Sequence, residues 1–72
     1  MEIYTNKETG KAFIYLDEQD DGRALMITPK GDVKVLEYHL FKEPFEVDAE
    51  EALMTQGQIT AKQYDIYNRY NR

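Results

Sequence analysis

Few residues of this chain have the types and spacing that chemistry needs, and His39 is the first to consider. It is the only histidine among 72 residues, and the chain has no cysteine and no serine. A histidine metal cluster is therefore excluded, and His39 has no serine or cysteine nucleophile to activate. An acid–base role with Glu37 or Glu43 would need a second candidate catalytic group at a suitable spacing, and the sequence offers none. We expect a half-buried strand residue at position 39 and a protein that is not an enzyme, with no catalytic, cofactor-binding or metal-binding residues.

The acidic segment from Asp17 to Gly22 imitates the start of a calcium-binding loop. Acids or amides stand at ligand positions one, three and five, and a glycine stands at position six. Position twelve is Thr28, which cannot supply the bidentate carboxylate of such a loop, and no predicted helices flank the segment. We expect a solvated turn between two strands that binds no calcium.

Tyrosines are the third candidate, because several share one side of a helix predicted over residues 61–72. On a helical wheel at about 100° per residue, this face holds Gln63, Tyr64, Ile66, Tyr67 and Tyr70. The opposite face is polar and carries the i,i+4 pair Asp65 and Arg69. The aromatic face either docks on the sheet of its own chain or contacts another molecule, and the sequence leaves both open.

Most of the chain before residue 48 is predicted to form the strands that position these residues. Turn clusters at residues 6–10, 19–22 and 29–32 separate short apolar, branched and aromatic runs. The runs are Ile3–Tyr4, Ala12–Leu16, Ala24–Thr28, Val33–Leu40 and Phe45–Val47. Apolar residues on both faces of these runs predict a curled sheet, packed inside and covered outside by a helix. For residues 1–47 we expect a four- to five-stranded antiparallel meander that could curl into a small SH3-like barrel.

Residues 48–72 are predicted to form a helical hairpin packed on this meander. A first helix starts at Asp48, with Glu51 completing a capping-box-like pair. Gly57 can take the left-handed conformation that ends a helix, and Thr60 with Gln63 has the capping-box spacing for the next one. The predicted fold class is therefore α+β, in a single domain spanning residues 1–72.

Charge and composition narrow the possible partners and the compartment. The net charge is -5, with thirteen acids against six bases through residue 60 and three bases against one acid after it. An acidic body is poorly suited to neutralise phosphates, so we expect no nucleic-acid binding. No apolar run approaches the roughly 20 residues of a membrane span, and the lack of cysteine favours a reducing compartment. We expect a cytoplasmic protein that binds no membrane and no cofactor.

One resemblance can be stated for the C-terminal part. The segment Glu51-Ala52-Leu53-Met54-Thr55-Gln56-Gly57-Gln58-Ile59-Thr60-Ala61-Lys62-Gln63-Tyr64-Asp65 resembles the short C-terminal helical hairpin called SHOCT, over roughly residues 50–70. The resemblance implies an element for oligomerisation or interaction. Tyr67 and Tyr70 stand where aliphatic residues would be expected, and residues 1–48 resemble no family.

Together these features predict a non-catalytic protein-interaction or assembly module of bacterial type. Its expected contact residues are Tyr64, Ile66, Tyr67 and Tyr70, and its expected partner is another protein or a second copy of itself. The alternative is an acidic binding protein that uses residues 17–21 and 46–51 to occupy a basic protein surface, as an inhibitor or nucleic-acid mimic would. The two differ in salt response, because binding through charges weakens with salt and burial of an aromatic face does not.

Overall fold

The computed structural model describes residues 1–54 and 58–71, which form a five-stranded antiparallel sheet followed by two helices. The strands are β1 (Glu2–Thr5), β2 (Ala12–Asp20), β3 (Arg23–Ile27), β4 (Val33–Glu37) and β5 (Phe45–Glu46). The helices are the 3-10 helix η1 (Tyr38–Leu40), α1 (Ala49–Met54) and α2 (Ala61–Tyr70). The α+β class and the two C-terminal helices predicted from the sequence are confirmed.

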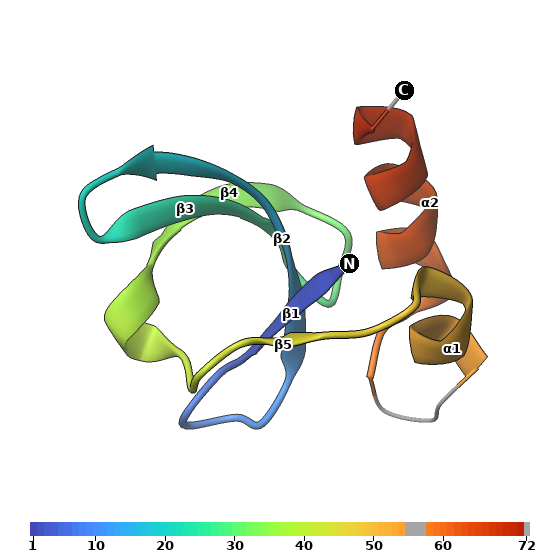
Figure 1. The fold of residues 1–72 in the computed structure, drawn as a ribbon, viewed down its shortest axis with the longest axis horizontal. Helices are drawn as coiled ribbons and strands as arrows, with labels where there is room; N and C mark the ends of the chain where they lie inside the picture. Colours follow the sequence, from blue (N-terminus) through green and yellow to red (C-terminus); the bar gives the residue numbers. More distant parts are fainter. Residues whose placement is uncertain (55–57, 72) are drawn as a thin grey trace.

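The sheet has the strand order β4-β3-β2-β1-β5 and curls around an interior without closing (Figure 1). Its centre is the nine-residue β2, which pairs with β1 through its first half and with β3 along its length. Two register shifts, between Tyr15 and Asp17 and between Glu18 and Asp20, interrupt the β2–β3 ladder. Such bulges bend a strand and increase its twist, which allows one long strand to follow the curl.

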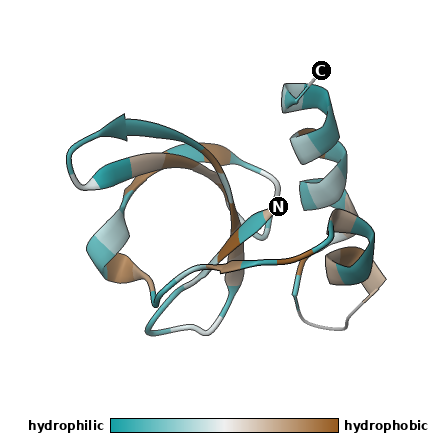
Figure 2. Ribbon diagram, in the orientation of Figure 1, coloured by the Kyte–Doolittle hydropathy of each residue, from teal (hydrophilic) through white to brown (hydrophobic). Residues whose placement is uncertain are grey.

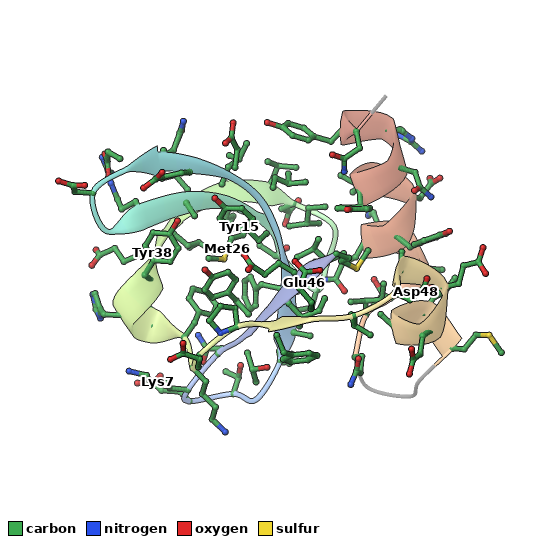
Figure 3. All side chains as sticks on the ribbon, in the orientation of Figure 1. Lys7, Tyr15, Met26, Tyr38, Glu46 and Asp48 are labelled. Atoms are coloured by element: carbon green, nitrogen blue, oxygen red, sulfur yellow. The ribbon has the colours of Figure 1, made fainter. Side chains whose placement is uncertain are left out.

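Both faces of the sheet carry apolar side chains, as the two-sided runs predicted. Inside the curl lies a cluster built on Tyr4, Ala24, Met26 and Phe41, and Figure 3 shows Tyr15, Met26 and Tyr38 within it. Outside, a second cluster joins the sheet to the helices, and its buried members are Ile3, Ala12, Ile14, Ile27, Ala52 and Ile59. Figure 1 places α1 and α2 together on this outer side. Since strand side chains alternate, one strand can feed both clusters.

Hydrophobic residues are concentrated in the part of the sheet nearest the helices (Figure 2). The far end of the β2–β3 hairpin is hydrophilic, and residues 17–23 there are all exposed. No helix within the described residues is long and apolar enough to cross a membrane.

The predicted strand over Val33–Leu40 is too long, and the expected setting of His39 is wrong. The strand β4 ends at Glu37, and residues 38–40 form the 3-10 helix. This turn lets the chain pass from β4, at one edge of the sheet, towards β5 at the other. The ring of Tyr38 then lies 5.7 Å from that of Tyr4 inside the curl, while the His39 side chain is 71% exposed.

Both predicted helix starts are present. The Asp48 carboxylate accepts a hydrogen bond from the Glu50 N–H at 3.1 Å, which caps α1. At α2, Thr60 and Gln63 form the complete capping box, in which each side chain binds the other residue's backbone N–H. The helix stop predicted at Gly57 lies outside the described residues.

Candidate interaction surfaces

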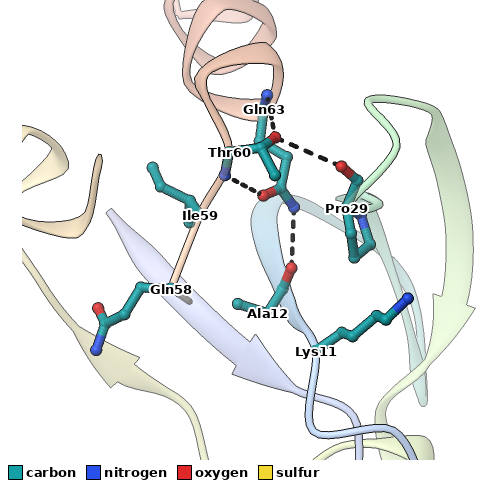
Figure 4. A pocket seen from close by; sticks show the side chains of 7 residues that line it. All are labelled: Lys11, Ala12, Pro29, Gln58, Ile59, Thr60 and Gln63. Atoms are coloured by element: carbon teal, nitrogen blue, oxygen red, sulfur yellow. Dashed lines mark hydrogen bonds between the residues drawn. The ribbon is translucent and has the colours of Figure 1, made fainter. Parts of the chain in front are cut away.

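The face of α2 that was predicted from the helical wheel is centred on Gln63, which is 1% exposed. Its Nε2 donates to the backbone oxygen of Ala12 at 2.9 Å and to that of Ile27 at 3.2 Å. Its Oε1 accepts from the Thr60 N–H at 2.9 Å (Figure 4). The amide is thus fully used, which a buried polar group requires. Gln63 therefore fixes α2 to the start of β2 and the end of β3.

The four predicted contact residues of α2 have different surroundings. Tyr64, Ile66 and Tyr67 are half-buried and pack against the outer core cluster of the same chain. Tyr70, at the end of the helix, is 46% exposed. Most of the aromatic face therefore holds the helix on the sheet, while Tyr70 is available on the surface. A contact of these residues with another molecule stays a prediction.

The inner cluster contains an aromatic group around Tyr4. Its ring centroid lies 5.7 Å from that of Tyr15 and 5.9 Å from that of Phe41, and Phe41 contacts Phe13 edge-on at 5.0 Å. Burial raises the pKa of Tyr15 to about 12, with a further contribution from the hydroxyl of Tyr38. Burial also raises the pKa of Tyr4. These rings form a packed core in tilted and edge-on geometries, and aromatic pairs favour the edge-on arrangement.

The remaining sequence candidates are exposed. His39 Nε2 contacts the carboxylate of Glu37, and both side chains are more than half exposed. The acidic segment forms the tip of the β2–β3 hairpin, where Asp20 pairs with Arg23 and Gly22 has φ 91°. In the part of the chain that the structure describes, no three acidic, histidine or cysteine side chains come together as metal ligands.

A pocket that the sequence did not indicate lies between the β1–β2 turn and the β3–β4 turn. It has a volume of about 300 Å³, and its lining includes Lys11, Lys30 and Lys34. Lys34 lies on the inner face of β4, because it pairs with the buried Met26 and directly opposite residues share a face. Asp32 and the ring of Phe13 also line this lysine pocket.

The lysines differ from the arginines in their partners. Within residues 1–54 and 58–71, Arg23 pairs with Asp20 and Arg69 with Asp65, whereas no lysine has a carboxylate within ion-pair distance. Lys62 also reaches the β3–β4 turn, since a Cβ added to Gly31 would lie 2.8 Å from its side chain. Gly31 has φ 89°, so both its conformation and this approach suit glycine.

A smaller pocket of about 160 Å³ lies beside the first and shares Lys11 and Pro29 with it (Figure 4). Thr60 and Gln63 line it, and the Thr60 hydroxyl reaches the backbone oxygen of Pro29 at 3.4 Å. Gln58 also lines this pocket, and its buried Oε1 has no hydrogen-bond partner in the part of the chain that the structure describes. The N-terminal end of α2 thus lines the smaller pocket, which adjoins the lysine pocket at Lys11 and Pro29.

Comparison with protein-family models, with curated proteins and with solved structures gives no match for this chain. The resemblance of residues 50–70 to the SHOCT hairpin therefore stays a prediction.

Proposed function

We propose that this protein is a non-catalytic protein-interaction module and that its lysine pocket is the main contact surface. The observation that carries the proposal is the gathering around one concave site of three lysines that have no ion-pair partner among the described residues. Holding like charges together is unfavourable for the free protein and becomes favourable when an anionic partner binds.

The helix α2 has a supporting role in this proposal. Tyr64, Ile66 and Tyr67 pack on the outer core, so their main contribution is to hold the helix that lines the smaller pocket beside the lysine pocket. Tyr70 is the member of this face with the most exposed ring and would serve as a flanking contact. The partner is another protein or a second copy of this chain, and a SHOCT-like role of residues 50–70 in self-association belongs to the same proposal.

The second candidate is an acidic protein that occupies a basic surface of its partner. It is favoured by the β2–β3 hairpin tip, where Asp17, Glu18 and Asp21 are exposed and have no cation within ion-pair distance in the described residues. Both candidates predict binding that weakens with salt, so salt alone does not separate them. The two candidates differ in which part of the molecule makes the contact, which is the lysine pocket for the first and the hairpin tip for the second.

The test is co-purification of a partner by the tagged protein from the cells that make it, using two matched double variants. Lys30→Gln with Lys34→Gln removes two positive charges from the pocket, and Glu18→Gln with Asp21→Asn removes two negative charges from the hairpin tip. Each pair keeps side-chain size close to the original and lies at exposed positions.

The proposal predicts that the lysine variant loses the partner that the wild type retains, while the hairpin variant keeps it. Loss with the hairpin variant alone would select the second candidate. If the wild type retains no partner and sediments as a monomer at high concentration, the interaction function is wrong.

A further inference from the structure

We propose that the lysine pocket binds a short segment of a partner protein that carries two or three closely spaced carboxylates. The inference rests on the proposed interaction function and specifies the chemistry of the partner. It follows from the hydrogen-bonding groups of the pocket, its net charge and its apolar wall.

The polar groups available in the pocket are mainly donors. Besides the three lysine ammonium groups, Asn6 presents its side-chain NH₂, because its Oδ1 already accepts from the N–H groups of Glu8 and Thr9 at 2.9 Å each. The Thr28 hydroxyl oxygen accepts from the Asp32 N–H at 3.1 Å, which leaves the hydroxyl hydrogen as a further donor. A site that offers donors and positive charge selects an anion with several acceptor oxygens.

The two turns that hold these donors are fixed by backbone hydrogen bonds. In the β1–β2 turn, the Asn6 and Lys11 backbones bond at 2.9 Å. In the β3–β4 turn, the Thr28 N–H donates to the Asp32 oxygen and the Gly31 N–H to the Thr28 oxygen, both at 2.8 Å. The pocket is therefore built before the ligand arrives, which lowers the entropy cost of binding.

The charge of the site limits the size of the ligand. Three lysines and Asp32 give the pocket a local charge of +2 within a protein of net charge -5. A nucleic acid would extend beyond the pocket over a protein whose net charge is negative, which disfavours its phosphates. A few carboxylates on a short segment match the charge and stay within the site.

An apolar wall favours a peptide over a small inorganic anion. The ring of Phe13 lines the pocket and is held edge-on by Phe41 at 5.0 Å, and Pro29 lies on the same lining. Together they offer a surface on which glutamate methylenes or a neighbouring aliphatic side chain can pack. Phosphate alone would leave this wall uncovered.

The experiment is a titration of the ¹⁵N-labelled full chain with a blocked tri-glutamate peptide, followed by NMR and calorimetry. Saturable shifts are expected for the two turns, at residues 6–11 and 28–34. Because two ion pairs are lost, Lys30→Gln with Lys34→Gln should weaken binding about tenfold. The control, Lys7→Gln with Lys42→Gln, has the same net charge, lies outside the pocket lining and should change binding less than about twofold.

Several results would overturn the inference. They are shifts spread over every lysine, equal weakening by the control pair, or saturation by inorganic phosphate or a single-stranded oligonucleotide at lower concentration than by the peptide. Failure here is distinguishable from failure of the interaction function. A partner that co-purifies with the wild type while the peptide does not bind would leave the function standing and remove only this ligand class.

Discussion

Replacing Gln63 by glutamate should make the stability of this protein strongly dependent on pH. The substitution keeps the size of the side chain and one oxygen for the Thr60 N–H, but it removes the NH₂ that donates to Ala12 and Ile27. An ionised carboxylate would then place an oxygen against two backbone oxygens in a site that is 1% exposed. Burial without a donor partner favours the protonated form and raises the pKa of the new carboxyl group.

The size of the stability loss follows from the difference between the pKa of the new carboxyl group in the folded protein and in the unfolded chain. With a pKa of about 4.3 in the unfolded chain and a folded pKa raised by about three units, stability is retained below about pH 4 and lost progressively up to about pH 7. At about 1.4 kcal/mol per unit, the loss at pH 7 is about 4 kcal/mol. A domain of this size has only about 3–5 kcal/mol of stability, so the variant should be largely unfolded at neutral pH. At pH 4 the protonated acid donates one hydrogen bond where the amide donated two, so the free energy of unfolding falls by only about 1 kcal/mol relative to the wild type.

The assay is urea unfolding followed by circular dichroism from pH 3.5 to 8, with Gln19→Glu as the control. Gln19 lies at an exposed position of β2, so the same chemical change there should leave the pH profile close to that of the wild type. The reasoning is refuted if Gln63→Glu differs from the wild type by the same free energy at pH 4 and pH 7. That result would mean that the new side chain does not occupy the amide's buried position.

Other consequences can be measured on the same protein. Thr60→Ala should lower the free energy of unfolding by about 1 kcal/mol through loss of the cap, and an unchanged denaturation midpoint would contradict this. Deletion of residues 66–72 should abolish the cooperative unfolding transition, because Ile66 and Tyr67 pack on the outer core; a folded truncated chain would show that α2 is not needed. Tyr15 should ionise near pH 12 in an ultraviolet titration, and since its pKa is raised, stability should be retained below about pH 10 and fall above it; a midpoint near 10 would contradict its burial. Calorimetry should detect no calcium binding at residues 17–22, whereas micromolar binding abolished by Asp17→Asn would reverse that assignment.

The features that the sequence predicted well depend on neighbouring residues. Alternation along β2 separates Ala12 and Ile14 from Phe13 and Tyr15, and the structure places these pairs in the outer and inner clusters. The spacing of Thr60 and Gln63 likewise identified the start of α2. Periodicity and capping act over a few residues, so a single sequence contains the information for them.

The features that the sequence missed depend on distant residues. The hydrogen bond from Gln63 to Ala12 spans 51 positions, so nothing near Gln63 signals it. The 3-10 helix after Glu37 was not predicted, because the apolar run continues to Leu40 and indicates a longer strand. The path of the chain around the curled sheet decides where the strand ends.

The lysine pocket was missed for the same reason. Lys11, Lys30 and Lys34 are scattered along the sequence, and the antiparallel register between the start of β2 and the end of β3 brings them together. A prediction that Ile14 pairs with Ile27 would have indicated the pocket, because this pairing places the β1–β2 turn and the β3–β4 turn side by side.

Site-resolved photo-crosslinking in the cells that make the protein tests the central proposal most directly. A photoreactive phenylalanine analogue is placed in turn at Lys30 in the pocket, at Glu18 on the hairpin tip and at Tyr70 on α2, all of which are exposed. If the lysine pocket is the contact surface for a partner protein, position 30 gives one discrete adduct that the Lys34→Gln change weakens, and position 18 gives none. Adducts from position 18 or position 70 without one from position 30, or no adduct at any position, would contradict the proposal.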